Sequence, residues 1–194
     1  NVDIVGTGVQ GSVEVFDNGN LVDTFTGVKS IKVNVKGGDD DVEIAALKIL
    51  GNVTVNLGDG ADQFDMDCTP IGTSPDGNIV IGGFVKATFG GDDGDFADWD
   101  SEGGFGITIG KSVTLNDAAF VDLSDGGTEI HEGTDIFIGG NFIVNLSGQG
   151  NTGGSFEVDL DDLIVGVNST INGTNSVERV RLVDNGFAGT FTIN

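Results

Sequence analysis

The sequence predicts an all-β protein that forms a three-sided parallel β-solenoid, with about six coils by its repeat length. Three observations indicate this fold. Short apolar segments that end in glycine recur at a nearly constant interval, and a strand with alternating apolar and polar residues follows each of them. In addition, no stretch carries the i, i+3, i+4, i+7 spacing of an amphipathic helix.

The glycine-terminated segments mark one corner of each coil. Their glycines are separated by 31, 28, 29 and 27 residues, and they are Gly51, Gly82, Gly110, Gly139 and Gly166. We expect these glycines to provide the positive φ that a sharp bend requires at the same place in every coil. Strands of an antiparallel sandwich, in contrast, are not copies of one another.

Each unit reads as strand, glycine bend, strand, Gly/Asp turn, strand and loop. In the first full unit, the second strand is Val53–Leu57 and the third is Phe64–Asp67. Alternation places one row of side chains inward and one outward. Three short strands cannot bury their apolar rows alone, whereas stacked coils with parallel pairing bury them. The antiparallel β-sandwich stays the alternative, because it also contains many short strands separated by turns.

The whole chain is expected to be one domain with distinct ends. Residues 1–26 form an N-terminal strand and a hairpin cap around Asn18-Gly19, a strong hairpin signal. Residues 27–186 form the coils, and residues 187–194 form an exposed C-terminal strand. Exposed strand edges can pair with another chain, so the expected partner is a second copy, joined head to tail.

The charge excludes several functions. Asp and Glu number 31 against 8 Lys and Arg, which gives a formal net charge of −23. Nucleic acid and anionic lipid both require cationic side chains, so neither is an expected partner. No apolar run is long enough for a membrane span. A secreted or cell-surface location is expected from the acidity, the single cysteine and a first residue, Asn1, that suggests processing.

Three Gly/Asp turns can be aligned without gaps, namely 35–42, 57–64 and 89–96. If the coils stack, the Asp residues of these turns gather at one corner, where like charges repel unless they are solvated, protonated or bridged by a cation. Ca²⁺ accepts many carboxylate oxygens in flexible geometry. The candidate metal ligands are therefore Asp39, Asp40, Asp41, Asp59, Asp62, Asp92, Asp93 and Asp95. The alternative is ordinary Asp/Gly turn chemistry.

The turn Gly58-Asp59-Gly60-Ala61-Asp62-Gln63-Phe64 resembles the calcium-binding RTX repeats of secreted bacterial proteins, which follow the pattern G-G-x-G-x-D-x-U-x. The segment from Leu21 to Ile44 is similar to large repetitive bacterial surface proteins. The RTX resemblance implies calcium at Asp62, and less closely at Asp40 and Asp95. The chain departs from the RTX pattern because its turns recur once per long coil rather than as tandem nonapeptides.

Signs of catalysis are few. His131 is the only histidine and is expected in a loop, and Cys68 is expected to be a buried small hydrophobe. Acid pairs such as Asp65/Asp67, Asp98/Asp100 and Asp159/Asp161 resemble glycosidase pairs, but they arise by chance among 31 acids. Residues 112–178 contain no Lys or Arg to assist them. Trp99 could stack on a sugar, although a core position is the simpler expectation.

These observations predict a non-enzymatic extracellular structural protein, a subunit of a surface fibre, filament or matrix that assembles end to end through terminal strands. The alternative is a calcium-dependent adhesion or carbohydrate-binding β-helix module, with glycans as partners. A polysaccharide lyase or hydrolase is a minor alternative.

Overall fold

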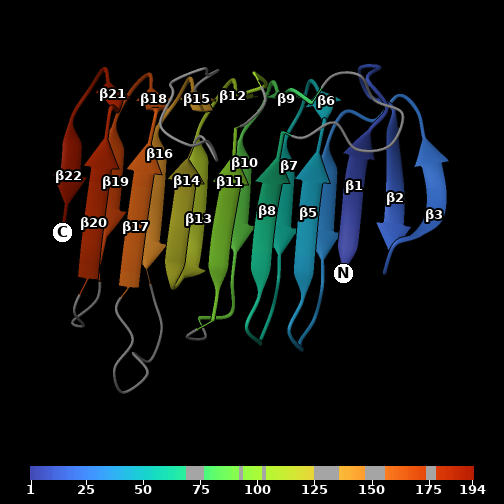
Figure 1. Ribbon diagram of the computed structural model, residues 1–194, viewed down its shortest axis with the longest axis horizontal. Coiled ribbons are helices and arrows are strands. Elements are labelled where there is room, and N and C mark those ends of the chain that lie inside the picture. The colour runs from blue at the N-terminus through green and yellow to red at the C-terminus, as the bar shows by residue number, and fades with distance from the viewer. Residues whose placement is uncertain (69–76, 92–93, 102–103, 125–135, 147–155, 174–177) are drawn as a thin grey trace.

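The computed structural model is described for residues 1–68, 77–91, 94–101, 104–124, 136–146, 156–173 and 178–194. It confirms the three-sided parallel β-solenoid (Figure 1). Consecutive strands of one coil belong to different sheets. Each strand pairs in parallel with its counterpart one coil away, as do β5 (Asp41–Ala45), β8 (Gln63–Asp67) and β11 (Phe96–Asp100). An antiparallel sandwich would need opposite strand directions between neighbours, so this pairing excludes it.

The three faces of the solenoid are sheets of different size. In spatial order, sheet A contains β20 (Glu178–Val183), β17 (Phe156–Asp161), β14 (Phe120–Ser124), β11 (Phe96–Asp100), β8 (Gln63–Asp67), β5 (Asp41–Ala45), β1 (Val2–Gly6), β2 (Val13–Asp17) and β3 (Asn20–Phe25). Sheet B contains β22 (Phe191–Ile193), β19 (Ser169–Asn172), β16 (Phe142–Leu146), β13 (Val113–Ala118), β10 (Val85–Thr88), β7 (Val53–Asn56) and β4 (Ile31–Asn34). Sheet C contains β21 (Gly186–Phe187), β18 (Leu163–Val165), β15 (Ile136–Ile138), β12 (Ile107–Ile109), β9 (Ile79–Ile81) and β6 (Lys48–Ile49).

The two ends of the solenoid differ. At the N-terminal end, β1 pairs in parallel with β5, and β2 and β3 then extend sheet A by antiparallel pairing. The β2–β3 turn has positive φ at Asn18 and Gly19, the backbone of a type I′ hairpin. At the C-terminal end, β20, β21 and β22 each form the last strand of their sheet. Two strands of sheet A, β2 and β3, therefore project beyond the coils at one end.

The inward rows of the three sheets fill the core. The largest fully buried side chains include Trp99, Phe64 and Phe142, and the Phe64 and Trp99 rings meet edge to face with centroids 5.8 Å apart. The thiol of Cys68 is buried as well, as expected. Trp99 is therefore part of the packing and does not face the surface, where it could have contacted a sugar.

The recurring corner glycines are required for a different reason from the expected one. They do not have positive φ. Instead, a Cβ on Gly110 would lie 2.7 Å from the carbonyl oxygen of Gly82, and one on Gly139 would lie 2.7 Å from that of Gly110. Glycine recurs at this corner because successive coils approach each other too closely for a side chain.

Side-chain amides add a second ladder between the coils. Asn145 donates from Nδ2 to Oδ1 of Asn116 (2.7 Å), Asn172 donates to Asn145 (2.7 Å), and Asn194 donates to Asn172 (2.8 Å). Such stacked amides satisfy one another in register and tie each coil to the previous one. Across the described residues, the structure contains no helix that could cross a membrane.

Candidate functional site

The corner between sheets B and A holds several of the predicted calcium ligands. Asp62 and Asp95 are fully buried there. Oδ1 of Asp62 accepts a hydrogen bond from the backbone N–H of Asp40 in the previous coil (2.9 Å), and Oδ1 of Asp95 accepts one from the N–H of Asp62 (3.2 Å). These two carboxylates therefore accept hydrogen bonds from backbone N–H groups of the neighbouring coil and tie the two turns together.

The remaining predicted ligands are only partly brought together. Oδ1 of Asp39 accepts the N–H of Ala61 (3.1 Å), and the backbone carbonyl of Asp59 accepts the N–H of Gly38 (2.9 Å). Asp41 lies apart on β5, where its Oδ2 accepts a hydrogen bond from Nδ2 of Asn1 (2.8 Å). The predicted ligands Asp92 and Asp93, together with the candidate loop residue His131, lie outside the described residues. In the part of the chain that the structure describes, no group of three or more His, Cys, Asp or Glu side chains is placed to hold a metal ion. Calcium therefore stays a prediction.

A second group of carboxylates lies on the outer face of sheet A. One outward position of this sheet carries an acid on six successive strands, and Arg181 ends the row; we call this row the acid ladder. In register order, it comprises Asp3, Glu43, Asp65, Asp98, Asp122 and Asp159. Neighbouring strands in a sheet are about 4.8 Å apart, so carboxylates within the row have like charges on both sides.

Burial and mutual repulsion raise the pKa of five acids in this row. Burial, followed by the charges of Asp41, Asp98 and Glu43, raises the pKa of Asp65 to about 7, although a hydrogen bond from Gln63 opposes the rise. Burial and neighbouring carboxylates raise the pKa of Asp98 to about 6. The pKa values of Asp3, Glu43 and Asp122 are also raised, with burial as the first cause in each case. Asp65 is therefore about half protonated at pH 7, and Asp98 carries a proton in part of the molecules.

The two arginines of the chain neutralise the C-terminal end of this face. Nη1 of Arg181 lies 2.9 Å from both carboxylate oxygens of Asp159, and Nη1 of Arg179 lies 2.7 Å from Oε1 of Glu157. Both pairs join β20 to β17 and are substantially exposed, so each contributes little to the free energy of folding. Arg181 matters more because it ends the row of like charges, next to Asp159.

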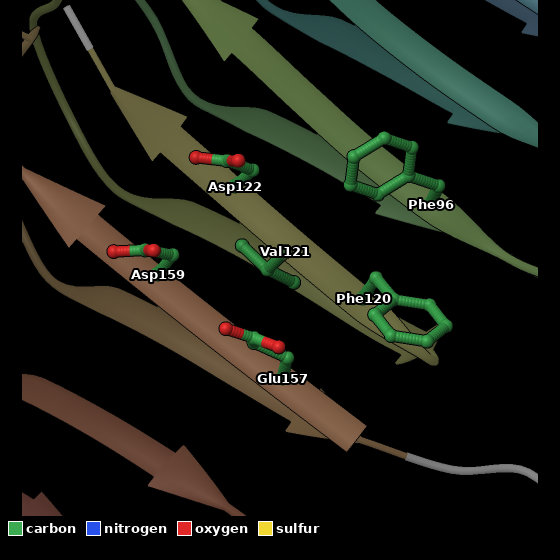
Figure 2. Close-up of a pocket in the computed structure, with 6 residues that line it drawn as sticks. All are labelled: Phe96, Phe120, Val121, Asp122, Glu157 and Asp159. Atoms are coloured by element: carbon green, nitrogen blue, oxygen red, sulfur yellow. The ribbon is translucent and has the colours of Figure 1, made fainter. Parts of the chain in front are cut away.

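Two hollows open on the same face. The larger, of about 270 Å³, is lined by Phe96, Phe120, Val121, Asp122, Glu157 and Asp159 (Figure 2), and we call it the aromatic hollow. The smaller, of about 140 Å³, is lined by Glu43, Asp65, Met66, Asp67, Asp98 and Asp100, and we call it the acidic hollow. The rings of Phe96 and Phe120 meet nearly at right angles in the aromatic hollow, with centroids 6.3 Å apart. Apolar and anionic groups are thus placed side by side on the surface.

The spacing of acids along the sequence does not reveal the acid ladder. Acid pairs such as Asp65/Asp67 and Asp98/Asp100 show that two acids share a strand face, and among 31 acids such pairs are expected by chance. The ladder depends instead on which residues of successive coils are in register. Alignment of the third strand of each unit could have found it, since Phe64-Asp65-Met66-Asp67 and Ala97-Asp98-Trp99-Asp100 then superimpose.

Comparisons with known proteins add no further constraint. No protein family, curated protein or solved structure matches this chain. The function must therefore be inferred from the geometry of the solenoid.

Proposed function

We propose that this chain is a non-enzymatic structural protein of the extracellular or cell-surface environment, a subunit that assembles end to end into a fibre, filament or matrix. One observation carries the proposal. All six residues of β3 are exposed, and this last strand of sheet A presents Leu21, Val22 and Phe25 with exposed fractions of 55%, 62% and 45%. A long, apolar edge strand offers unpaired backbone groups and apolar area to another chain.

The opposite end of the solenoid supports the same proposal. Leu182 on β20 and Ile193 on β22 are 41% and 53% exposed, although both belong to apolar rows of the coil. Phe187 and Phe191 pack against each other with centroids 4.7 Å apart and are only partly buried. A head-to-tail contact that stacks copies along the axis of the solenoid does not close into a ring, so it generates a filament. The acidic surface disfavours lateral clumping of these filaments by charge repulsion.

Assembly should depend on the edge strands. At high protein concentration and about 0.15 M salt, where the Debye length is about 8 Å, we expect negative-stain microscopy to show filaments. Val22→Lys should shorten or abolish them, because a charge on an edge strand opposes pairing. Val9→Lys is the matched control, since Val9 is 65% exposed but lies outside the strands. Dispersed monomers of the unaltered chain would contradict the proposal.

A second candidate is a calcium-dependent adhesion or carbohydrate-binding module. The aromatic hollow favours it, because ligand sites combine apolar side chains with a few polar groups. The corner carboxylates and the acid ladder are the places where calcium would act in such a module. This candidate differs from the structural one in needing no self-association.

Calcium can be tested by thermal unfolding. If the module requires calcium, 1 mM Ca²⁺ added to chelator-treated protein should raise Tm, because a ligand that binds only the folded state stabilises it by RT ln(1 + [L]/Kd). Mg²⁺ at the same concentration controls for general screening of the 31 acids. A melting curve that is identical with calcium and with chelator would remove calcium from the second candidate.

A further inference from the structure

The aromatic hollow combines partly exposed aromatic rings with carboxylates. Phe96 and Phe120 occupy neighbouring strands, β11 and β14, at the same outward position, and both rings are only partly buried. Figure 2 shows them on one side of the hollow, with Asp122 and Asp159 on the other and Glu157 between. Phe120 packs partly against the core and Phe96 is not among the residues that do, yet both rings keep part of their surface exposed beside the carboxylates of the outer face.

The rings define one part of the ligand. Their exposed surfaces can cover the C–H face of a pyranose ring, which removes apolar area from water. The same aromatic faces attract a cation within about 6 Å of the ring centroid. A ligand that fits the rings is thus partly apolar, and a positive charge strengthens its binding.

The charges define the other part. Three carboxylates line the aromatic hollow, and two of them, Glu157 and Asp159, are paired with arginines. Asp122 lies on β14, between Asp98 and Asp159 of the acid ladder. The acidic hollow, next to the aromatic hollow on the same face, is lined by five carboxylates and Met66. The described residues of its wall include no Lys or Arg. An acidic glycan would be repelled by this face, and a neutral one could donate hydroxyl hydrogen bonds to the carboxylates but could not form ion pairs with them.

We infer that the aromatic hollow binds an oligosaccharide of primary amino sugars, whose pyranose rings contact Phe96 and Phe120 and whose ammonium groups face Asp122 and its neighbours on the acid ladder. The inference rests on the carbohydrate-binding candidate and names its ligand class. Because the acid ladder runs from strand to strand, an oligomer that extends across the strands continues from the aromatic hollow to the acidic hollow. Successive amines then meet successive carboxylates.

The test uses isothermal titration of the full chain with a β-1,4-linked glucosamine hexamer, with its fully N-acetylated counterpart and with hexalysine. We expect binding of the glucosamine hexamer, at least tenfold weaker binding of the acetylated form, and loss of affinity as salt rises, because charges are screened. Equal binding of the two sugars would overturn the amino-sugar inference while retaining the carbohydrate-binding candidate. Binding of neither would overturn both, and hexalysine binding as tightly as the sugar would show attraction of any polycation and also overturn the inference.

Variants locate the site. Phe120→Ala and Asp122→Asn should each weaken binding of the glucosamine hexamer by about tenfold, which corresponds to about 1.4 kcal/mol. Asp23→Asn removes the same charge from exposed β3 and should leave the affinity unchanged. Circular dichroism checks that each variant is folded. If Asp23→Asn weakens binding as much as Asp122→Asn does, net charge alone is responsible and the hollow is not the site.

Discussion

Gly90→Ala should leave the chain largely unfolded at 25 °C. Gly90 follows β10 in the turn into sheet A, and a Cβ placed on it would overlap the carbonyl oxygen of Gly58 in the previous coil. Because that oxygen belongs to the backbone, the overlap can be removed only if the two coils move apart. This movement breaks hydrogen bonds between them. A loss above about 4 kcal/mol is expected, which is exceptional for one substitution and comparable with the whole stability of many domains.

The measurement is urea unfolding followed by far-UV circular dichroism. Gly27→Ala is the matched control, since Gly27 has φ +71° but, apart from Gly27 itself and its two chain neighbours, no described atom lies within 4 Å of where the new methyl group would stand. Its expected cost is only the left-handed backbone strain of about 1–2 kcal/mol. If Gly90→Ala unfolded at the same urea concentration as Gly27→Ala, the close approach of successive coils would be contradicted.

The free energy of unfolding should fall as pH rises from about 4 to about 7. In the folded state the pKa of Asp65 is about 7, against an ordinary value of 3.8, so between these values the folded chain binds more protons than the unfolded chain. The contribution of Asp65 to stability is therefore complete below pH 3.8 and is lost as Asp65 ionises. The full shift corresponds to about 4 kcal/mol, and solvent screening of this partly exposed carboxyl reduces it to about 1–2 kcal/mol. Asp98, whose pKa is about 6, acts in the same direction.

Asp65→Asn should remove much of this pH dependence. The amide has nearly the same shape and no charge, so we expect Tm to rise by about 3–6 °C at pH 8 and to change little at pH 4. Differential scanning calorimetry from pH 4 to 8 measures both effects. Asp23→Asn on β3 lies outside the acid ladder and should leave the slope unaltered. A lower Tm for Asp65→Asn at pH 8 would show that the carboxylate stabilises the sheet.

The repeat makes the architecture predictable. The near-constant spacing of Gly51, Gly82 and Gly110 sets one corner of each coil, and alternation in strands such as Val53–Asn56 distinguishes inward from outward rows. The predicted reason for the glycines is wrong, because the separation between two coils is a tertiary distance. Local sequence can suggest a positive φ, but it cannot show that Gly82 and Gly110 lie in contact.

The candidate site is less predictable for the same reason. Asp62 and Asp40 belong to the same corner, as the aligned turns suggest. There, however, the carboxylate of Asp62 accepts a hydrogen bond from the backbone N–H of Asp40 in the adjacent coil. The motif could not show this competition between a metal and the backbone. The acid ladder depends on register between distant residues, as between Asp98 and Asp122 or between Asp122 and Asp159. The unequal spacing of these acids along the chain hides the regular spacing that they have across the sheet.

The backbone hydrogen bonds of all three sheets run from one coil to the next, as from Val85 to Ser112 and from Val113 to Asn141. A tensile load on the two ends of the rod would therefore act along the direction of these bonds. Under such a load the terminal coil should unfold first while the other coils stay folded. Each coil that unfolds would release roughly 30 residues, about 100 Å of extended chain. The molecule would then lengthen in steps under force and dissipate mechanical energy at each step.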